Sequence, residues 1–186
     1  MKSIILTTKD KPLRLYNAEQ EIAKLGIKAD VFYAVENADA KLSFNLSMQH
    51  IMRNNDSVLA FFEDDVIIKD NNHYQIAIDQ LPSNWELCYL GANITGAVER
   101  YSDNLFKMNG GWTTHAILFN NPKKLCENYI DPNQMFDDWL SNNIHPRGNT
   151  FIISPMIAWQ QIHHSMLWDR VADYTDILNN SANKLI

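Results

Sequence analysis

The sequence predicts an α/β domain in which helices flank a mostly parallel central sheet. Apolar segments of strand length alternate with helix-like segments along most of the chain. The order strand, helix, strand is the βαβ pattern, which gives parallel strands joined by a right-handed crossover. A length of 186 residues suits one domain with a sizeable core. We therefore expect residues 1–186 to form one three-layer domain.

The expected strands are short apolar segments rich in branched and aromatic residues. They cover residues 3–8, 31–35, 58–66, 85–90, 114–119 and 151–154. The expected helices cover residues 17–25, 43–52, 74–81, a segment from 122 onward, and 136–142. Asn17 and Ser43 are the predicted N-caps, Gly26 ends the first helix, and Pro122 suits a first-turn position.

Charge and cysteine content narrow the class of protein. The chain has 16 Lys and Arg against 22 Asp and Glu, for a formal net charge of -6, which disfavours broad capture of nucleic acid or anionic membrane. Cys88 and Cys126 both lie in apolar segments, so we expect two reduced core thiols. No stretch approaches the roughly 20 apolar residues of a membrane span, and the first apolar run is too short for a signal peptide. These features predict a cytoplasmic protein without stable membrane insertion.

The strand at 58–66 ends in three consecutive carboxylates, Glu63, Asp64 and Asp65. Side chains alternate along an extended strand, so Glu63 and Asp65 should share one face. Two carboxylates about 5 Å apart repel by roughly 3 kcal/mol at an effective dielectric constant of 20. A hard divalent cation with a nucleotide diphosphate would compensate for this repulsion. The alternative is a strand that ends in solvated acids.

Polar residues also follow the other early strands. Thr7 and Thr8 end the first strand, Glu36 follows the second, and Gly91 follows the strand at 85–90. In open α/β sheets, ligands bind outside the carboxyl ends of the strands. We therefore expect these residues to line one crevice, although each cluster alone suits an ordinary loop.

Five segments, in this order along the chain, resemble the motifs of glycosyltransferase family 25, the lipooligosaccharide β-galactosyltransferases and their collagen-modifying relatives. The segments are Phe62-Glu63-Asp64-Asp65, Tyr89-Leu90-Gly91, Thr114-His115-Ala116-Ile117, Phe136-Asp137-Asp138-Trp139-Leu140, and the spaced residues Pro155, Gln160 and Ser165. The resemblance covers most of residues 1–170. Two places depart from the family pattern: Ser47-Met48 stands for a Ser-His pair, and Ser165-Met166-Leu167 stands for Ser-Asp-Ile.

This resemblance implies a GT-A-like, Rossmann-type fold and a reaction that inverts the anomeric carbon. A hexose would move from a UDP-sugar to the hydroxyl of a glycan, a protein or a modified nucleic-acid base. Mn²⁺ or Mg²⁺ would bind Asp65, and Glu63 would bind the metal or the ribose. His164 of the His163–His164 pair is the candidate third ligand.

The resemblance also assigns candidate roles in catalysis and donor binding. Asp137 is the candidate general base, with Asp138 as the alternative, and helix capping would also explain Asp137. The candidate donor-binding residues are Thr7, Thr8, Arg14, Glu36, Asp64, Gly91 and Gln160. Arg14 would reach the donor phosphates or pair with a surface acid.

Two other functions use the same residues. A non-catalytic protein that binds a nucleotide sugar would keep the sheet and lose the base. A metal-dependent phosphoesterase would use the acids, but such sites usually cluster more His and Asp ligands than this chain offers.

Overall fold

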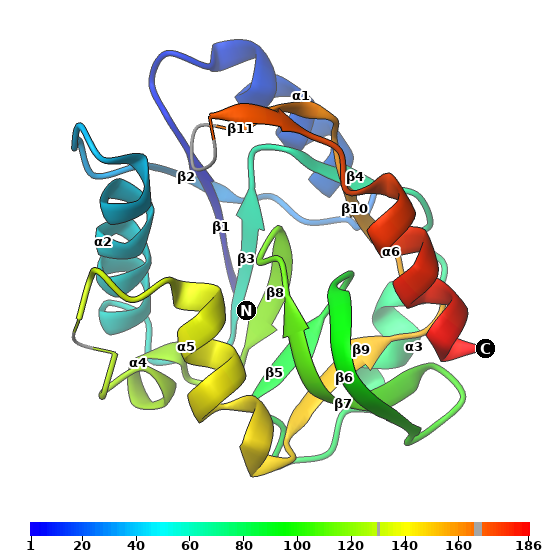
Figure 1. Ribbon diagram of the computed structural model, residues 1–186. Helices are drawn as coiled ribbons and strands as arrows, with labels where there is room; N and C mark the ends of the chain where they lie inside the picture. The colour runs from blue at the N-terminus through cyan, green and yellow to red at the C-terminus, as the bar shows by residue number, and fades with distance from the viewer. Residues whose placement is uncertain (130, 166–168) are drawn as a thin grey trace.

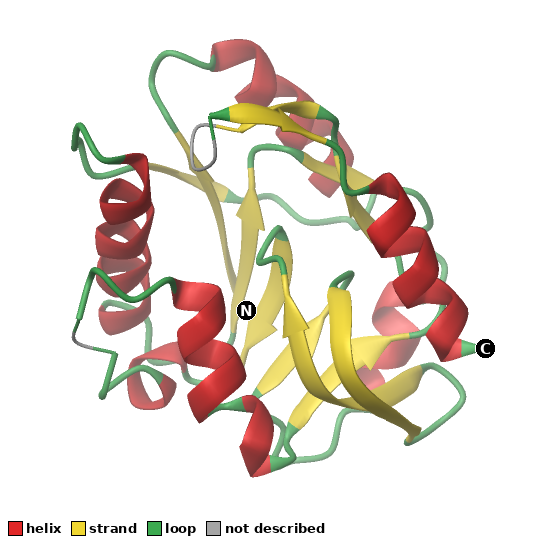
Figure 2. Cartoon of the chain, in the orientation of Figure 1, coloured by secondary structure: helices red, strands yellow, loops and turns green. Residues whose placement is uncertain are grey.

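The computed structural model describes residues 1–129, 131–165 and 169–186, and within them it is an α/β structure with helices on both faces of a large sheet (Figures 1 and 2). The eight strands of this sheet lie in the order β2-β1-β3-β8-β5-β9-β7-β6. Their bounds are β1 (Lys2–Thr7), β2 (Asp30–Tyr33), β3 (Leu59–Glu63), β5 (Leu87–Tyr89), β6 (Asn93–Arg100), β7 (Leu105–Trp112), β8 (Ala116–Phe119) and β9 (Thr150–Ile153). Traced through the pairings, all of these strands except β7 and β8 share one direction. The predicted fold class is confirmed.

Two small antiparallel ribbons lie beside the main sheet. One pairs β10 (Ala158–Gln160) with β4 (Val66–Ile68), and the other pairs β11 (His163–Ser165) with β12 (Arg170–Ala172). Figure 1 shows β11 beside α1 (Pro12–Ala23), above the end of β3. These ribbons therefore bring residues 158–165 close to the ends of the N-terminal strands β1 and β3.

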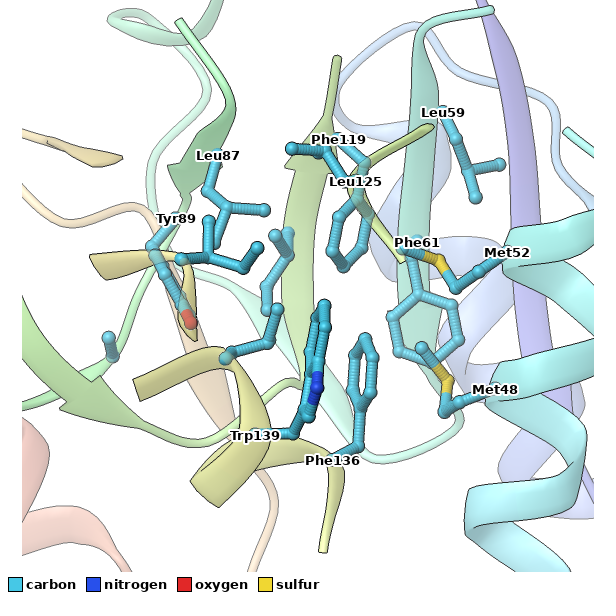
Figure 3. Packing of buried hydrophobic residues seen from close by; sticks show 14 of the residues in the cluster. Met48, Met52, Leu59, Phe61, Leu87, Tyr89, Phe119, Leu125, Phe136 and Trp139 are labelled. Carbon is cyan, nitrogen blue, oxygen red and sulfur yellow. The ribbon is translucent and has the colours of Figure 1, made fainter. Parts of the chain in front are cut away.

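The two faces of the sheet have separate apolar cores. On one face, α1 and α3 (Tyr74–Asp79) cover Ile5 and Phe62. The opposite face is covered by α2 (Ala40–Arg53), α4 (Pro122–Leu125), α5 (Phe136–Asn143) and α6 (Thr175–Ala182), and short 3₁₀ turns follow at His145–Arg147 and Asn183–Leu185. Figure 3 shows Met48 and Met52 of α2 beside Phe61, with Phe136 and Trp139 of α5 opposite them. Packing on both faces holds β1 and β3 in place.

All six predicted strands have counterparts, but several boundaries were wrong. The strand at 58–66 ends at Glu63, and Asp64 and Asp65 form a turn into β4. The first helix begins at Pro12 rather than Asn17, because Pro12 occupies the first helical position. Ser43 is not an N-cap: Asp39 caps α2 by accepting from the amides of Lys41 and Leu42 at 2.8 and 3.2 Å.

The β6–β7 hairpin was not predicted, because its glycines suggest loops. Gly96 lies so close to β7 that an added Cβ would sit 1.8 Å from the carbonyl oxygen of Asn109. Here glycine permits the close approach of two paired strands.

Other expectations concern thiols and membranes. Cys88 and Cys126 are free and buried, as predicted. None of the helices in the described ranges is long and apolar enough to cross a membrane.

Candidate active site

A cavity of about 420 Å³ opens where β1, β2 and β3 end and α1 begins. Eight of the residues predicted for the site line it: Thr7, Thr8, Arg14, Glu36, Glu63, Asp64, Asp65 and Gln160. The carboxyl ends of these adjacent parallel strands meet at one edge, as the sequence predicted for this crevice. Sequence reasoning assigned no role to Lys11 or Tyr174, which also line the cavity. They lie in loops without a motif, so no pattern pointed to them.

Asp64 is held by two donors from the first βα unit. Its Oδ2 accepts a hydrogen bond from Thr7 Oγ1 at 2.6 Å, and its Oδ1 accepts from Arg14 Nη2. Burial raises the pKa of Asp64 above its ordinary value, although Arg14 and Thr7 act against this shift. Asp64 therefore fixes Arg14 against the end of β3.

Asp65 faces the late ribbons. Its Oδ2 accepts from His163 Nε2 at 2.6 Å and from Gln160 Nε2 at 3.3 Å, and it lies 3.7 Å from Arg14 Nη2. Burial acts to raise the pKa of Asp65, but the His163 hydrogen bond and the charges of His163 and Arg14 hold it below its ordinary value. We call Asp64, Asp65, Arg14 and His163 the aspartate cluster.

Because of this cluster, the chain itself compensates part of the charge at the acidic strand end. The prediction that Glu63 and Asp65 share a face was wrong in its geometry, because the strand stops before Asp64. Arg14 and His163 donate hydrogen bonds to the carboxylates where the sequence predicts a divalent cation.

Glu63 and Asp137 lie in a different environment, on either side of Thr114, and we call them the carboxyl pair. Thr114 Oγ1 donates to Glu63 Oε1 at 2.7 Å, and the Thr113 amide donates to Asp137 Oδ2 at 3.1 Å. Burial, followed by the charge of Asp65, raises the pKa of Glu63 well above its ordinary range. Burial raises the pKa of Asp137 to about 6, against the effect of the hydrogen bond from the Thr113 amide. Asp137 Oδ1 is buried and has no hydrogen-bond partner among the described residues.

Asp137 lies in the first turn of α5, but its side chain does not cap the helix. Neither Asp137 nor Asp138 lines the cavity. Asp138 is exposed, whereas Asp137 is connected to the cavity wall through Thr114 and Glu63.

His164 and Gly91, like Asp137 and Asp138, do not line the cavity. His164 is 61% exposed, lies 3.7 Å from Asp169 and does not contact Asp65. Alternation along β11 turns its neighbour His163 into the cavity instead. Gly91 packs beneath β10: an added Cβ would sit 1.9 Å from the carbonyl oxygen of Ala158. The departure at Met166 and Leu167 lies outside the described residues.

The residue types at Asp65 fit a hard divalent cation. Asp65 Oδ1 and Gln160 Oε1 are buried acceptors without a donor within the described ranges, and His163 offers an imidazole beside them. Carboxylate, amide oxygen and imidazole are suitable ligands for Mn²⁺. In the described part of the chain, no group of three or more His, Cys, Asp or Glu side chains is already arranged to hold a metal ion.

Comparisons with known proteins show the fold. No family model and no curated protein matches the chain. A mutant of Drosophila β1,4-galactosyltransferase 7, solved with manganese, UDP-Gal and xylobiose, superposes with a TM-score of 0.55 at 11% identity, over 92% of this chain and 74% of that chain. The A197 protein from STIV gives a TM-score of 0.53 at 14% identity, over 92% and 93% of the two chains. At these identities the likeness is one of fold, and the chain has a GT-A-like fold.

Proposed function

We propose that this protein is a metal-dependent, inverting glycosyltransferase that moves a hexose from a UDP-sugar to an acceptor hydroxyl, and that it is a distant relative of family 25. The observation that carries the proposal is the acidic end of β3, which opens into the cavity at the carboxyl edge of the sheet. In folds of this type, that edge is where a nucleotide binds.

The cavity suits the donor in size and charge. About 420 Å³ lies within the range of pockets that hold small ligands. Lys9, Lys11 and Arg14 line it at the β1–α1 junction, where they could meet the phosphates of a donor. The galactosyltransferase that shares the fold was solved with UDP-Gal, which supports a nucleotide sugar as the donor.

Asp65, Gln160 and His163 are the residues that would hold Mn²⁺ or Mg²⁺, with Glu63 nearby. When bound, the ion would act as a Lewis acid that offsets charge on the leaving diphosphate. The protein's own contribution is to orient these ligands: Gln160 and His163 enter from the β10 and β11 ribbons, and Asp65 from the β3–β4 turn.

Asp137 is our candidate for the general base. Its Oδ1 has no hydrogen-bond partner among the described residues, while the Thr113 amide holds Oδ2. Because Asp137 does not line the cavity, the acceptor hydroxyl would have to approach Oδ1 past Thr114 and Glu63. A base performs best when its pKa lies near the working pH, and burial brings the pKa of Asp137 to about 6. The acceptor would be a glycan, a protein or a modified base.

A donor screen tests the proposal. Purified protein is incubated with Mn²⁺, UDP-hexoses and candidate acceptors, and release of free UDP is measured. We expect release from a UDP-hexose that increases with acceptor and stops with chelator. Binding without release would instead support a non-catalytic nucleotide-sugar-binding protein. Hydrolysis of p-nitrophenyl phosphate would support a phosphoesterase.

A further inference from the structure

Arg14 contacts three members of the aspartate cluster at once. Its Nη2 donates to Asp64 Oδ1 and lies 3.7 Å from Asp65 Oδ2, while its Nη1 lies 3.4 Å from His163 Nδ1. Its Nε is buried and has no partner among the described residues. The guanidinium is therefore fixed on the aspartates but keeps one donor unused.

Arg14 also lies against the imidazole of His163. Its Nη1 is 3.4 Å from His163 Nδ1, while His163 Nε2 donates to Asp65 Oδ2 at 2.6 Å. The hydrogen bond places a proton on the nitrogen that faces Asp65, and a nitrogen that carries a proton cannot ligate a metal ion. In this arrangement the donors of Arg14 and His163 occupy the carboxylate oxygens that a metal ion would use.

The same guanidinium also opposes a metal by its charge. A divalent cation on Asp65 would lie close to a positive group that is already bound to Asp64. A nucleoside diphosphate changes this balance, because its oxygens offer Arg14 an alternative anionic partner with suitable geometry. Once Arg14 turns to the phosphates, its positive charge no longer opposes a metal ion at Asp65.

We infer that Arg14 is a built-in counter-ion that leaves the aspartates when a nucleoside diphosphate binds, so that metal binding depends on the nucleotide. This inference rests on the proposed function, because it assumes that the cavity takes a metal and a nucleoside diphosphate. It assigns Arg14 a positioning role beyond contact with phosphate. Its distinctive consequence is that loss of Arg14 should strengthen the binding of the metal alone.

Titration of free Mn²⁺ by electron paramagnetic resonance, with and without UDP, tests the inference without an activity assay. For the unmodified protein, we expect UDP to tighten Mn²⁺ binding by about tenfold or more, within the usual range of coupling between sites. Arg14→Gln should bind Mn²⁺ alone about five- to tenfold more tightly, and the tightening by UDP should shrink.

Arg147→Gln is the matched control. It makes the same substitution away from the cavity, because Arg147 is exposed and pairs with Glu86 at 3.0 Å. We expect its affinity for Mn²⁺ alone to stay within about twofold of the unmodified protein, because an exposed charge is largely screened. Uridine, which lacks phosphates, should not tighten Mn²⁺ binding in any of these proteins.

A folded Arg14→Gln variant that binds Mn²⁺ alone no more tightly than the unmodified protein would overturn the inference. Absence of Mn²⁺ binding even with UDP would overturn the inference and also the metal requirement in the proposed function, which UDP release tests separately. If Arg14→Gln does not fold, ¹⁵N NMR of the unmodified, metal-free protein decides. The inference requires the signal of Arg14 Nε to shift when UDP is added, and an unchanged signal at saturating UDP would contradict it.

Discussion

Asp64 and Asp65 differ from Glu63 and Asp137 in how their charges are balanced, although the four carboxyls surround one strand end. The two aspartates receive hydrogen bonds from Arg14 or His163. His163 and Arg14 hold the pKa of Asp65 below its ordinary value, whereas at Asp64 Arg14 opposes, without overcoming, the rise in pKa that burial causes. The carboxyl pair receives hydrogen bonds only from neutral donors, Thr114 and the Thr113 amide, and burial raises the pKa of both members.

This difference suggests a division of roles. Where neighbouring acids have their pKa values pushed apart, one group can remain an anion while another exchanges protons near neutral pH. Asp65 suits the first role, as a ligand, and Asp137 suits the second, as a base. The turn after Glu63 makes this possible, because it directs consecutive acids toward different partners.

The largest expected effect is on the rate of transfer when Asp137, the candidate base, is replaced. Asp137→Asn keeps the size of the side chain and an acceptor for the Thr113 amide, but it removes the base. Transfer should fall by about 10² to 10⁴, while affinity for the donor stays nearly unchanged. Both quantities are measured on the same preparation. Near-normal transfer by the folded variant would move the role to Asp138 or to a base on the acceptor.

The next largest effect is on the stability that metal and nucleotide add through Asp65. With UDP and Mn²⁺ at 100 times their dissociation constant, the unmodified protein should gain about 2.7 kcal/mol of stability in a thermal-shift experiment. Asp65→Asn should lose most of the part that depends on metal, and Asp64→Asn should lose less. An equal shift with and without chelator would show that the nucleotide binds without metal.

The smallest effect concerns the pH dependence of stability. The folded-state pKa of Asp137, about 6, lies above its ordinary value of 3.8. The folded protein therefore binds the proton more tightly than the unfolded chain, so stability is lost as the pH rises from about 4 to 6. Asp137→Asn should be more stable than the unmodified protein at pH 7, by about 1 to 3 kcal/mol, and nearly equal to it at pH 4. Urea unfolding at both pH values measures this difference, and an equal difference at the two values would contradict the raised pKa.

Sequence patterns predicted the architecture well where periodicity and strand length were clear. The alternation through residue 90 identified β1, β2 and β3, and hence the edge where the cavity lies. The β6–β7 hairpin was missed because Gly96 and Gly110 look like loop residues, whereas their lack of side chains lets two strands approach.

The sequence predicted which residues line the site better than it predicted which of them contact one another. Placing Glu63, Asp64 and Asp65 at a strand end required only local reasoning. The choice of His163 over its neighbour depended on the register of a three-residue strand, and the pairing of Arg14 with Asp64 spans 50 residues. Such contacts are set by how the ribbons pack on the first helix, which one sequence does not specify.

Gly91 was predicted to contact the donor, but it packs against Ala158 of β10, outside the cavity lining. Its missing side chain lets Ala158 settle against the end of β5, and Ala158 begins the short strand that ends at Gln160. An alanine there would push this strand outward and move Gln160 away from Asp65, without altering any group in the cavity wall. Substitutions at position 91 would therefore inactivate the protein as strongly as substitutions of the acidic residues. Mutagenesis alone would then suggest that Gly91 contacts the ligand, although its role is to leave room for Ala158.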